Sequence, residues 1–173
     1  MEEIIEREIS VDEYIAGFRN AEACMEACRE CPNFGRTWAC PPFDFDVIER
    51  ISRYRRLRLV ACTARLADGA DFGSFDTIRP LRDKMDRRIL EIERACGDAL
   101  ACAFGGYCRR CSSCARPQGL PCRHPEAVRP ALEAYGFDVC RTLDKLFGIT
   151  LEWASPGHTP TRLTLLGGVF YNP

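Results

Sequence analysis

The stretch RLRLVACTARL, residues 56–66, decides how the middle of this chain folds. Leu57, Leu59 and Ala61 occupy alternate positions, and beyond Arg58 the residues between them are apolar or small as well. Successive side chains of a strand point to opposite faces of a sheet. The pattern therefore predicts a β-strand that is largely buried past its first residues.

Elements on both sides of this strand predict a sheet with helices packed on it. Short apolar runs indicate further strands. Helices are indicated by N-cap residues, which are Ser10 with Glu13 as a capping box, Asn20, Asp44 or Asp46, Ser74 and Asp138. The helix after Ser74 carries an apolar stripe of Ile78, Leu81, Met85, Ile89 and Ile92. Strands are expected at residues 2–8, 99–104, 149–153 and 161–171, and helices at 10–19, 20–28, 44–53, 74–95, 125–135 and 138–147, with a turn region at 69–73. We therefore expect an α/β fold of the α+β sandwich type, in which one small mixed sheet is flanked by helices. The length of 173 residues suits a single domain over residues 1–173.

Four cysteines in the second half of the chain have the spacing of a metal-binding loop. Three of them form C-x2-C-x2-C, and the fourth follows eight residues later: Cys108, Cys111, Cys114 and Cys122. Three thiolates at this spacing wrap one region of a cube, and a more distant cysteine completes the four ligands of a [4Fe–4S] cluster. Zinc is the alternative, but zinc ribbons usually present two separate C-x2-C pairs. The overlapping pairs here favour an iron–sulfur cluster.

A second group of four lies near the N-terminus and predicts another metal centre. Its spacing is C-x3-C-x2-C-x8-C, and its members are Cys24, Cys28, Cys31 and Cys40. Radical-SAM enzymes share the first part of this spacing, but Cys40 adds a fourth thiolate and the chain is too short for their barrel. We expect a second [4Fe–4S] cluster, with structural zinc as the alternative. Which fourth cysteine serves which cluster is open, because two-cluster ferredoxins exchange that ligand. Both loops are expected at the ends of the sheet.

The remaining features narrow the class of protein. Four further cysteines are expected to be small buried hydrophobic residues: Cys62, Cys96, Cys102 and Cys140. The N-terminus lacks the basic and apolar regions of a signal peptide, and no apolar run approaches a bilayer span. We therefore expect a cytoplasmic protein with reduced thiols and no membrane contact. The net charge of −1 gives no signature of nucleic-acid binding.

Two segments carry a resemblance to a known family. CRECPNFGRTWACPPFDFD (28–46) and GGYCRRCSSCARPQGLPCRHPEAVRPALEAYGFDV (105–139) resemble a family of predicted metal-binding proteins found in bacteria and archaea, many of them anaerobic. Together with the strand-like segments between and after them, the resemblance covers almost the whole chain. It implies metal binding and no particular activity.

Three functions are compatible with these patterns. The leading hypothesis is a small redox protein that passes electrons between partner enzymes, with the arginine-rich stretch 109–129 docking an acidic partner. The second is an enzyme whose cluster has an open iron, with an anionic substrate held by Arg109, Arg110, Arg123 and His124. The third is a zinc-stabilised interaction module. A homodimer could form through an uncovered sheet edge.

Overall fold

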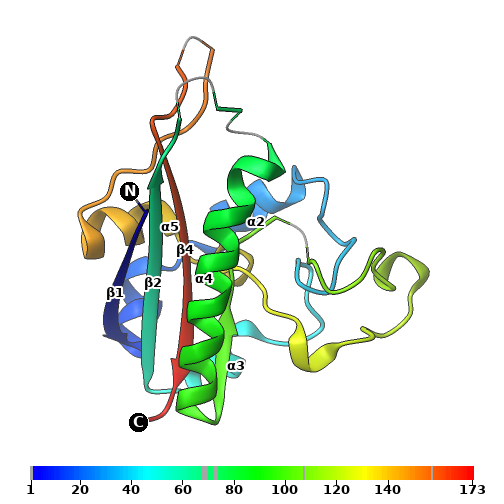
Figure 1. The fold of residues 1–173 in the computed structure, drawn as a ribbon. Coiled ribbons are helices and arrows are strands. Elements are labelled where there is room, and N and C mark those ends of the chain that lie inside the picture. Colours follow the sequence, from blue (N-terminus) through cyan, green and yellow to red (C-terminus); the bar gives the residue numbers. More distant parts are fainter. Residues whose placement is uncertain (1, 68–69, 72–73, 107, 157) are drawn as a thin grey trace.

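The fold is built on one antiparallel sheet of four strands (Figure 1). The computed structural model describes residues 2–67, 70–71, 74–106, 108–156 and 158–173. The strands lie in the order β1 (Glu2–Ser10), β2 (Arg56–Arg65), β4 (Arg162–Tyr171) and β3 (Ala99–Cys102). The expected α+β class with a single sheet is confirmed. All three strand pairs are antiparallel, whereas we expected a mixed sheet.

Strand β2 is the buried strand that its sequence predicts. Leu57, Leu59 and Ala61 point to one face of the sheet and belong to one apolar cluster. Val60 and Cys62 point to the other face and belong to a second cluster. Each face therefore needs a covering layer, because both sets of side chains are buried.

Helix α4 (Phe75–Cys96) covers one face of the sheet, as Figure 1 shows. Ser74 caps it, and its apolar stripe of Leu81, Met85, Ile89 and Ile92 packs on the sheet, as the sequence predicts. The helix approaches β4 most closely at Gly167. A Cβ atom there would lie 2.5 Å from Ile89 Cδ1 and 2.7 Å from the Cys102 carbonyl oxygen. Only glycine fits this contact.

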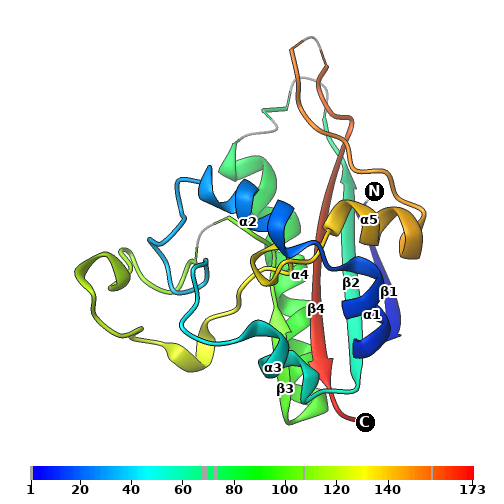
Figure 2. The same ribbon diagram turned by 180° about the vertical axis from the view of Figure 1, so that it is seen from behind.

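Shorter helices cover the opposite face, seen from behind in Figure 2. They are α1 (Val11–Phe18), α3 (Val47–Ser52), α5 (Val139–Thr142) and the π-helical turn η4 (Leu143–Phe147) that continues α5. The predicted caps are confirmed: Ser10 and Glu13 form a capping box, and Asp46 and Asp138 cap α3 and α5. These four residues set where each helix begins.

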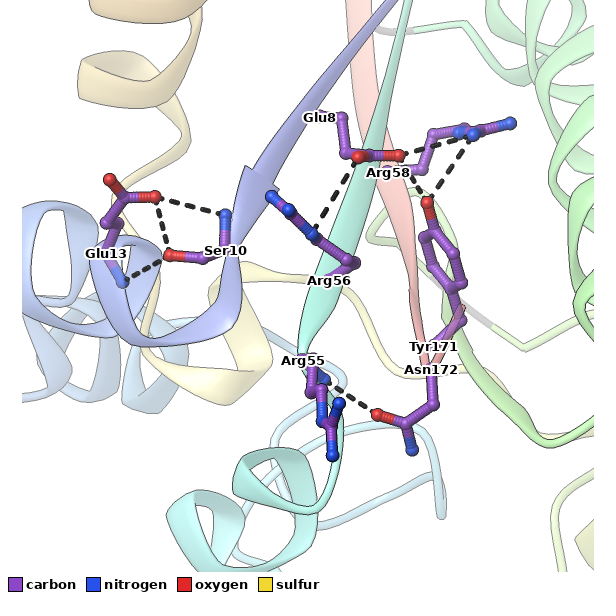
Figure 3. A network of polar contacts seen from close by, with 8 residues as sticks. All are labelled: Glu8, Ser10, Glu13, Arg55, Arg56, Arg58, Tyr171 and Asn172. Atoms are coloured by element: carbon purple, nitrogen blue, oxygen red, sulfur yellow. Dashed lines mark hydrogen bonds and ion pairs between the residues drawn. The ribbon is translucent and has the colours of Figure 1, made fainter.

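A polar network connects β1, β2 and β4 near one end of these strands (Figure 3). Glu8 of β1 pairs with Arg58 of β2 at 3.3 Å and accepts a hydrogen bond from the Tyr171 hydroxyl of β4. The Arg55 backbone N–H donates to Asn172 Oδ1 at 3.0 Å. These contacts join three neighbouring strands at the same end.

Three sequence predictions need correction or lie outside the described residues. Residues 149–153 form no strand: they pair with none of the four strands, and Ile149 and Leu151 pack on the core as single side chains. Residues 125–135 form no continuous helix but two 3-10 turns, η2 (Pro125–Ala127) and η3 (Glu133–Tyr135), because Pro130 interrupts the run. The turn region expected at 69–73 falls mainly on residues outside the described ranges.

Candidate metal centre

The two cysteine-rich segments lie next to each other although about 60 residues separate them in the sequence. The first segment is helix α2 (Ala21–Arg29) with the loop 30–46, here called the first loop. The second loop, residues 105–124, contains the 3-10 turn η1 (Arg116–Gln118). Figures 1 and 2 show both beside α4 and the edge strand β3, rather than at the ends of the sheet.

Successive tight turns shape the first loop. Cys28 lies in the last turn of α2, and its carbonyl oxygen accepts from the Cys31 N–H at 3.0 Å. The Cys31 carbonyl oxygen accepts from the Phe34 N–H at 3.0 Å, and the Cys40 N–H donates to the Thr37 carbonyl oxygen at 3.1 Å. These turns bring the backbone back on itself, so the three cysteines face one region.

Polar contacts hold the second loop against the first. Arg116 donates to the carbonyl oxygens of Thr37 at 2.7 Å and Cys40 at 2.5 Å, and its guanidinium carbon lies 5.0 Å from the centre of the Trp38 ring. The Trp38 indole N–H donates to the Leu120 carbonyl oxygen at 3.1 Å. These bonds use backbone acceptors, which fixes the position of one loop on the other.

A cavity of about 640 Å³ opens where the two loops meet α4. Four cysteines from both sequence groups line it: Cys28, Cys31, Cys40 and Cys108. The other wall comes from α4, the exit of β3 and residues 127–134. The remaining predicted ligands, Cys24, Cys111, Cys114 and Cys122, are outside this lining. The structure therefore brings together three cysteines of the first group and one of the second.

The thiols surround the cavity without converging on one point. All twelve cysteines carry free thiols. Within the described ranges, no three Cys, His, Asp or Glu side chains stand close enough together to hold a single metal ion. The donor chemistry nevertheless fits a thiophilic centre, because four thiols are the ligand set of iron–sulfur clusters and structural zinc.

The environment of the first group opposes thiolate formation unless a cation is bound. Burial raises the pKa of Cys28, and the neighbouring Cys40 and Cys31 add to that effect. Burial likewise raises the pKa of Cys40, against which Arg116 acts. Cys24 has its pKa raised to about 11 by burial and by the charge of Asp138. A bound metal cation supplies the positive charge that reverses this balance.

The residues expected to bind an anion fall into two sets. Arg109 and Arg110 line the cavity, although Arg109 donates to Asp83 at 2.7 Å and Asp86 at 2.8 Å. Arg123 and His124 are outside the lining. The guanidinium of Arg123 donates to the Ser113 carbonyl oxygen, and the backbone N–H of His124 lies 3.4 Å from the Cys122 sulfur.

Two residues that line the cavity are not among the predicted ligands of a metal or an anion. Arg129 pairs with Glu93 at 2.6 Å, and its Nη1 is buried without a hydrogen-bond partner among the described residues. Glu133 is partly exposed as a residue, but its Oε2 is buried and has no such partner either. Burial raises the pKa of Glu133 to about 7. The sequence marks Arg129 only as the end of the arginine-rich stretch 109–129 and gives no signal for Glu133, because their neighbours in space come from α4 and β3.

Of the four cysteines expected in the core, two are buried and two are not. Cys62 and Cys102 are buried in β2 and β3, as predicted. Cys96 is only partly buried at the end of α4, and Cys140 is exposed on α5, so these two predictions are wrong. Cys96 is the last residue of α4, and Cys140 lies on the short helix α5, so both are at the edge of the core.

Comparisons with known proteins agree with a metal-binding role. A family model described as "Predicted metal-binding protein (DUF2284)" matches residues 7–171. No curated protein and no solved structure matches the chain. Among the described residues, none of the helices combines the length and apolar character that crossing a bilayer requires.

Proposed function

Because the chain belongs to the family of predicted metal-binding proteins (DUF2284), we propose that its two cysteine groups hold two [4Fe–4S] clusters and that it transfers electrons between partner redox enzymes. The observation that supports this most is the joint cavity. Thiols of both groups line it, so two centres built on these loops would be neighbours. When bound, such clusters supply one-electron redox chemistry.

The protein's own residues would fix the loops and exclude water around the sulfur ligands. Arg116 ties the second loop to the carbonyl oxygens that flank Cys40. The His124 backbone N–H points at the Cys122 sulfur, the type of hydrogen bond that tunes a sulfur ligand. Trp38 lies over the contact between the two loops.

Docking of an acidic partner would depend on few of the arginines. Arg109 and Arg129 form ion pairs within the chain, and Arg116 and Arg123 donate to backbone carbonyl oxygens. Arg110 is exposed at the cavity. We propose that a partner docks at this side, with an affinity that falls as the salt concentration rises.

Anaerobic purification tests the proposal. The expected result is a brown protein with broad absorption near 400 nm and about eight irons per chain, as two four-iron clusters require. The colour should bleach on reduction and return on reoxidation. A colourless protein that contains zinc would support the interaction module instead and would end the redox proposal.

One observation favours an enzyme as the second candidate. The cavity is within the size range of small-molecule sites, and its lining includes the buried Arg129 Nη1 and Glu133 Oε2 without partners. An anionic substrate would satisfy the arginine. Titration of the loaded protein with small carboxylic acids tests this: saturable changes in the electron paramagnetic resonance spectrum that Arg129→Lys abolishes would support catalysis.

A further inference from the structure

The geometry points to a metal centre shared between the two loops. We propose that Cys28, Cys31, Cys40 and Cys108 ligate one centre, so that Cys108 takes the place that sequence spacing gives to Cys24. This inference rests on the proposed function, since it names the ligands of one of its centres. It assigns Cys108, a cysteine of the second motif, to the metal centre of the first motif.

The lining of the cavity supports this set. Among the eight cysteines of the two motifs, these four line the same cavity. The turns of the first loop also keep its three cysteines together, since the Cys31 N–H donates to the Cys28 carbonyl oxygen at 3.0 Å and the Cys40 N–H donates to the Thr37 carbonyl oxygen at 3.1 Å.

Contacts on both sides of Cys108 tie it to the walls of the cavity, one to the first loop and one to α4. Asn33 Nδ2, two residues beyond Cys31, donates to the Gly106 carbonyl oxygen at 3.1 Å. On the other side, the Arg109 guanidinium donates to Asp83 and Asp86 of α4. These two anchors hold Cys108 at the cavity, whereas Cys111 and Cys114 continue away from its lining.

Cys24 lies further from the first loop. It is one turn of α2 before Cys28, about 6 Å along the helix axis, and it is not part of the cavity lining. The N-terminal end of α2 is itself fixed elsewhere, because the Asn20 N–H donates to the Gly136 carbonyl oxygen at 2.8 Å. A rotation of α2 that moved Cys24 to the cavity would break this contact.

Serine substitutions with metal counting test the assignment. The protein is reconstituted anaerobically, and iron and sulfide are measured per chain, with Co²⁺ loading as a parallel measurement of thiolate–metal charge-transfer absorption. Cys24→Ser should keep the full metal content, like the exposed control Cys140→Ser. Cys108→Ser and Cys28→Ser should each lose about half of the metal, because each removes a ligand of the same four-cysteine centre.

Double variants give the decisive result. Cys28→Ser combined with Cys108→Ser should lose no more metal than either change alone, because both act on one centre. Cys28→Ser combined with Cys111→Ser should lose both centres. If Cys28 and Cys108 instead lose metal additively, or if Cys24→Ser loses a centre, the assignment is overturned.

A measurement on the unaltered protein covers the case in which a variant does not fold. The chain is loaded with increasing Cd²⁺ and its thiols are alkylated and located by mass spectrometry. Protection of Cys108 should rise together with that of Cys28 while Cys24 stays reactive; protection of Cys108 together with Cys111 overturns the inference. A chain that binds neither iron, Co²⁺ nor Cd²⁺ at its thiols would refute the proposed function itself.

Discussion

The sheet and the two cysteine loops are stabilised in different ways. Around β2 and β4, apolar side chains on both faces are buried against α4 and the shorter helices. In the first and second loops, few side chains are buried; Thr37, Pro41 and Ala115 are. The contacts between the loops are hydrogen bonds to backbone carbonyl oxygens. One half is therefore held by the hydrophobic effect, and the other by polar contacts and, in our proposal, by metal.

Because the two halves are stabilised in different ways, we expect different changes to destabilise each of them. Loss of metal should loosen the loops and leave the sheet intact, since a metal site stabilises the segment that supplies its ligands. Substitutions in the apolar core should destabilise the sheet and leave the loops bound to metal. The predictions below separate the two halves on this basis.

The largest expected effect is that of metal removal on the loops. After chelation, backbone amides of the first and second loops should exchange hydrogen on the order of a hundredfold faster, while those of β2 and β4 change little. Hydrogen exchange followed by mass spectrometry on the loaded and chelated protein measures this. Equal acceleration in both halves would show that they unfold as one unit.

A pH effect should arise at Glu133, where the two halves meet. Its pKa rises from 4.5 in the unfolded chain to about 7 in the folded protein. Below pH 4.5 the carboxyl is protonated in both states. As the pH rises towards 7, only the unfolded state loses the proton, so the folded state loses about 3 kcal/mol of stability, and this loss is complete above pH 7.

Glu133→Gln removes that titration. Urea unfolding at pH 4 and pH 8 should therefore show the variant gaining about 3 kcal/mol over the unaltered protein between the two pH values. Two parallel stability curves would mean that the pKa of Glu133 is the same in the folded and the unfolded protein.

A substitution in the sheet should weaken that half alone. Gly167→Ala places a methyl group within 2.7 Å of the Cys102 carbonyl oxygen, which belongs to the backbone of β3 and has little room to move. We expect a loss of about 2 kcal/mol in the free energy of unfolding, with the metal content of the folded protein unchanged.

Gly17→Ala in α1 is the matched control. A Cβ at Gly17 would meet nothing within 4 Å, and alanine suits a helix better than glycine. Denaturant titration should show a gain of roughly 0.5 kcal/mol. A loss of equal size in both variants would contradict the close contact between α4 and β4.

The smallest expected effect is local to the loops. Arg116→Lys keeps the charge but cannot donate in the same way to the three carbonyl oxygens that Arg116 reaches. Metal release to a chelator should become several-fold faster, equivalent to about 1 kcal/mol, with little change in global unfolding. Arg36→Lys, on an exposed arginine of the first loop, should release metal at the unaltered rate.

The sheet half could be predicted well because its signals are local. Alternation identified β2, the stripe from Leu81 to Ile92 identified α4, and Ser10 with Glu13 identified the start of α1. The strand predicted at 149–153 was wrong because the alternation of Ile149 and Leu151 reveals that these side chains pack on the core but not whether their backbone pairs with another strand. Pairing is a property of the whole sheet.

The candidate site could be predicted in type but not in arrangement. Spacing alone identified both cysteine groups, and the family match supports metal binding. Spacing could not place Cys108 beside Cys40, because that proximity follows from contacts such as those of Asn33 and Arg116 across the chain. Arg129 and Glu133 were missed for the same reason: they belong to the cavity only once α4 and β3 are in place.

The position of β4 in the sheet has a consequence for the order in which the protein folds. This strand follows every other element along the chain, yet it is the neighbour of both β2 and β3. Until it has been synthesised, β3 has no partner strand among the described residues, and the second loop leads out of an unanchored segment. The pocket between the loops, which the exit of β3 helps to line, is thus fully formed only after residues 162–171 have paired with β3.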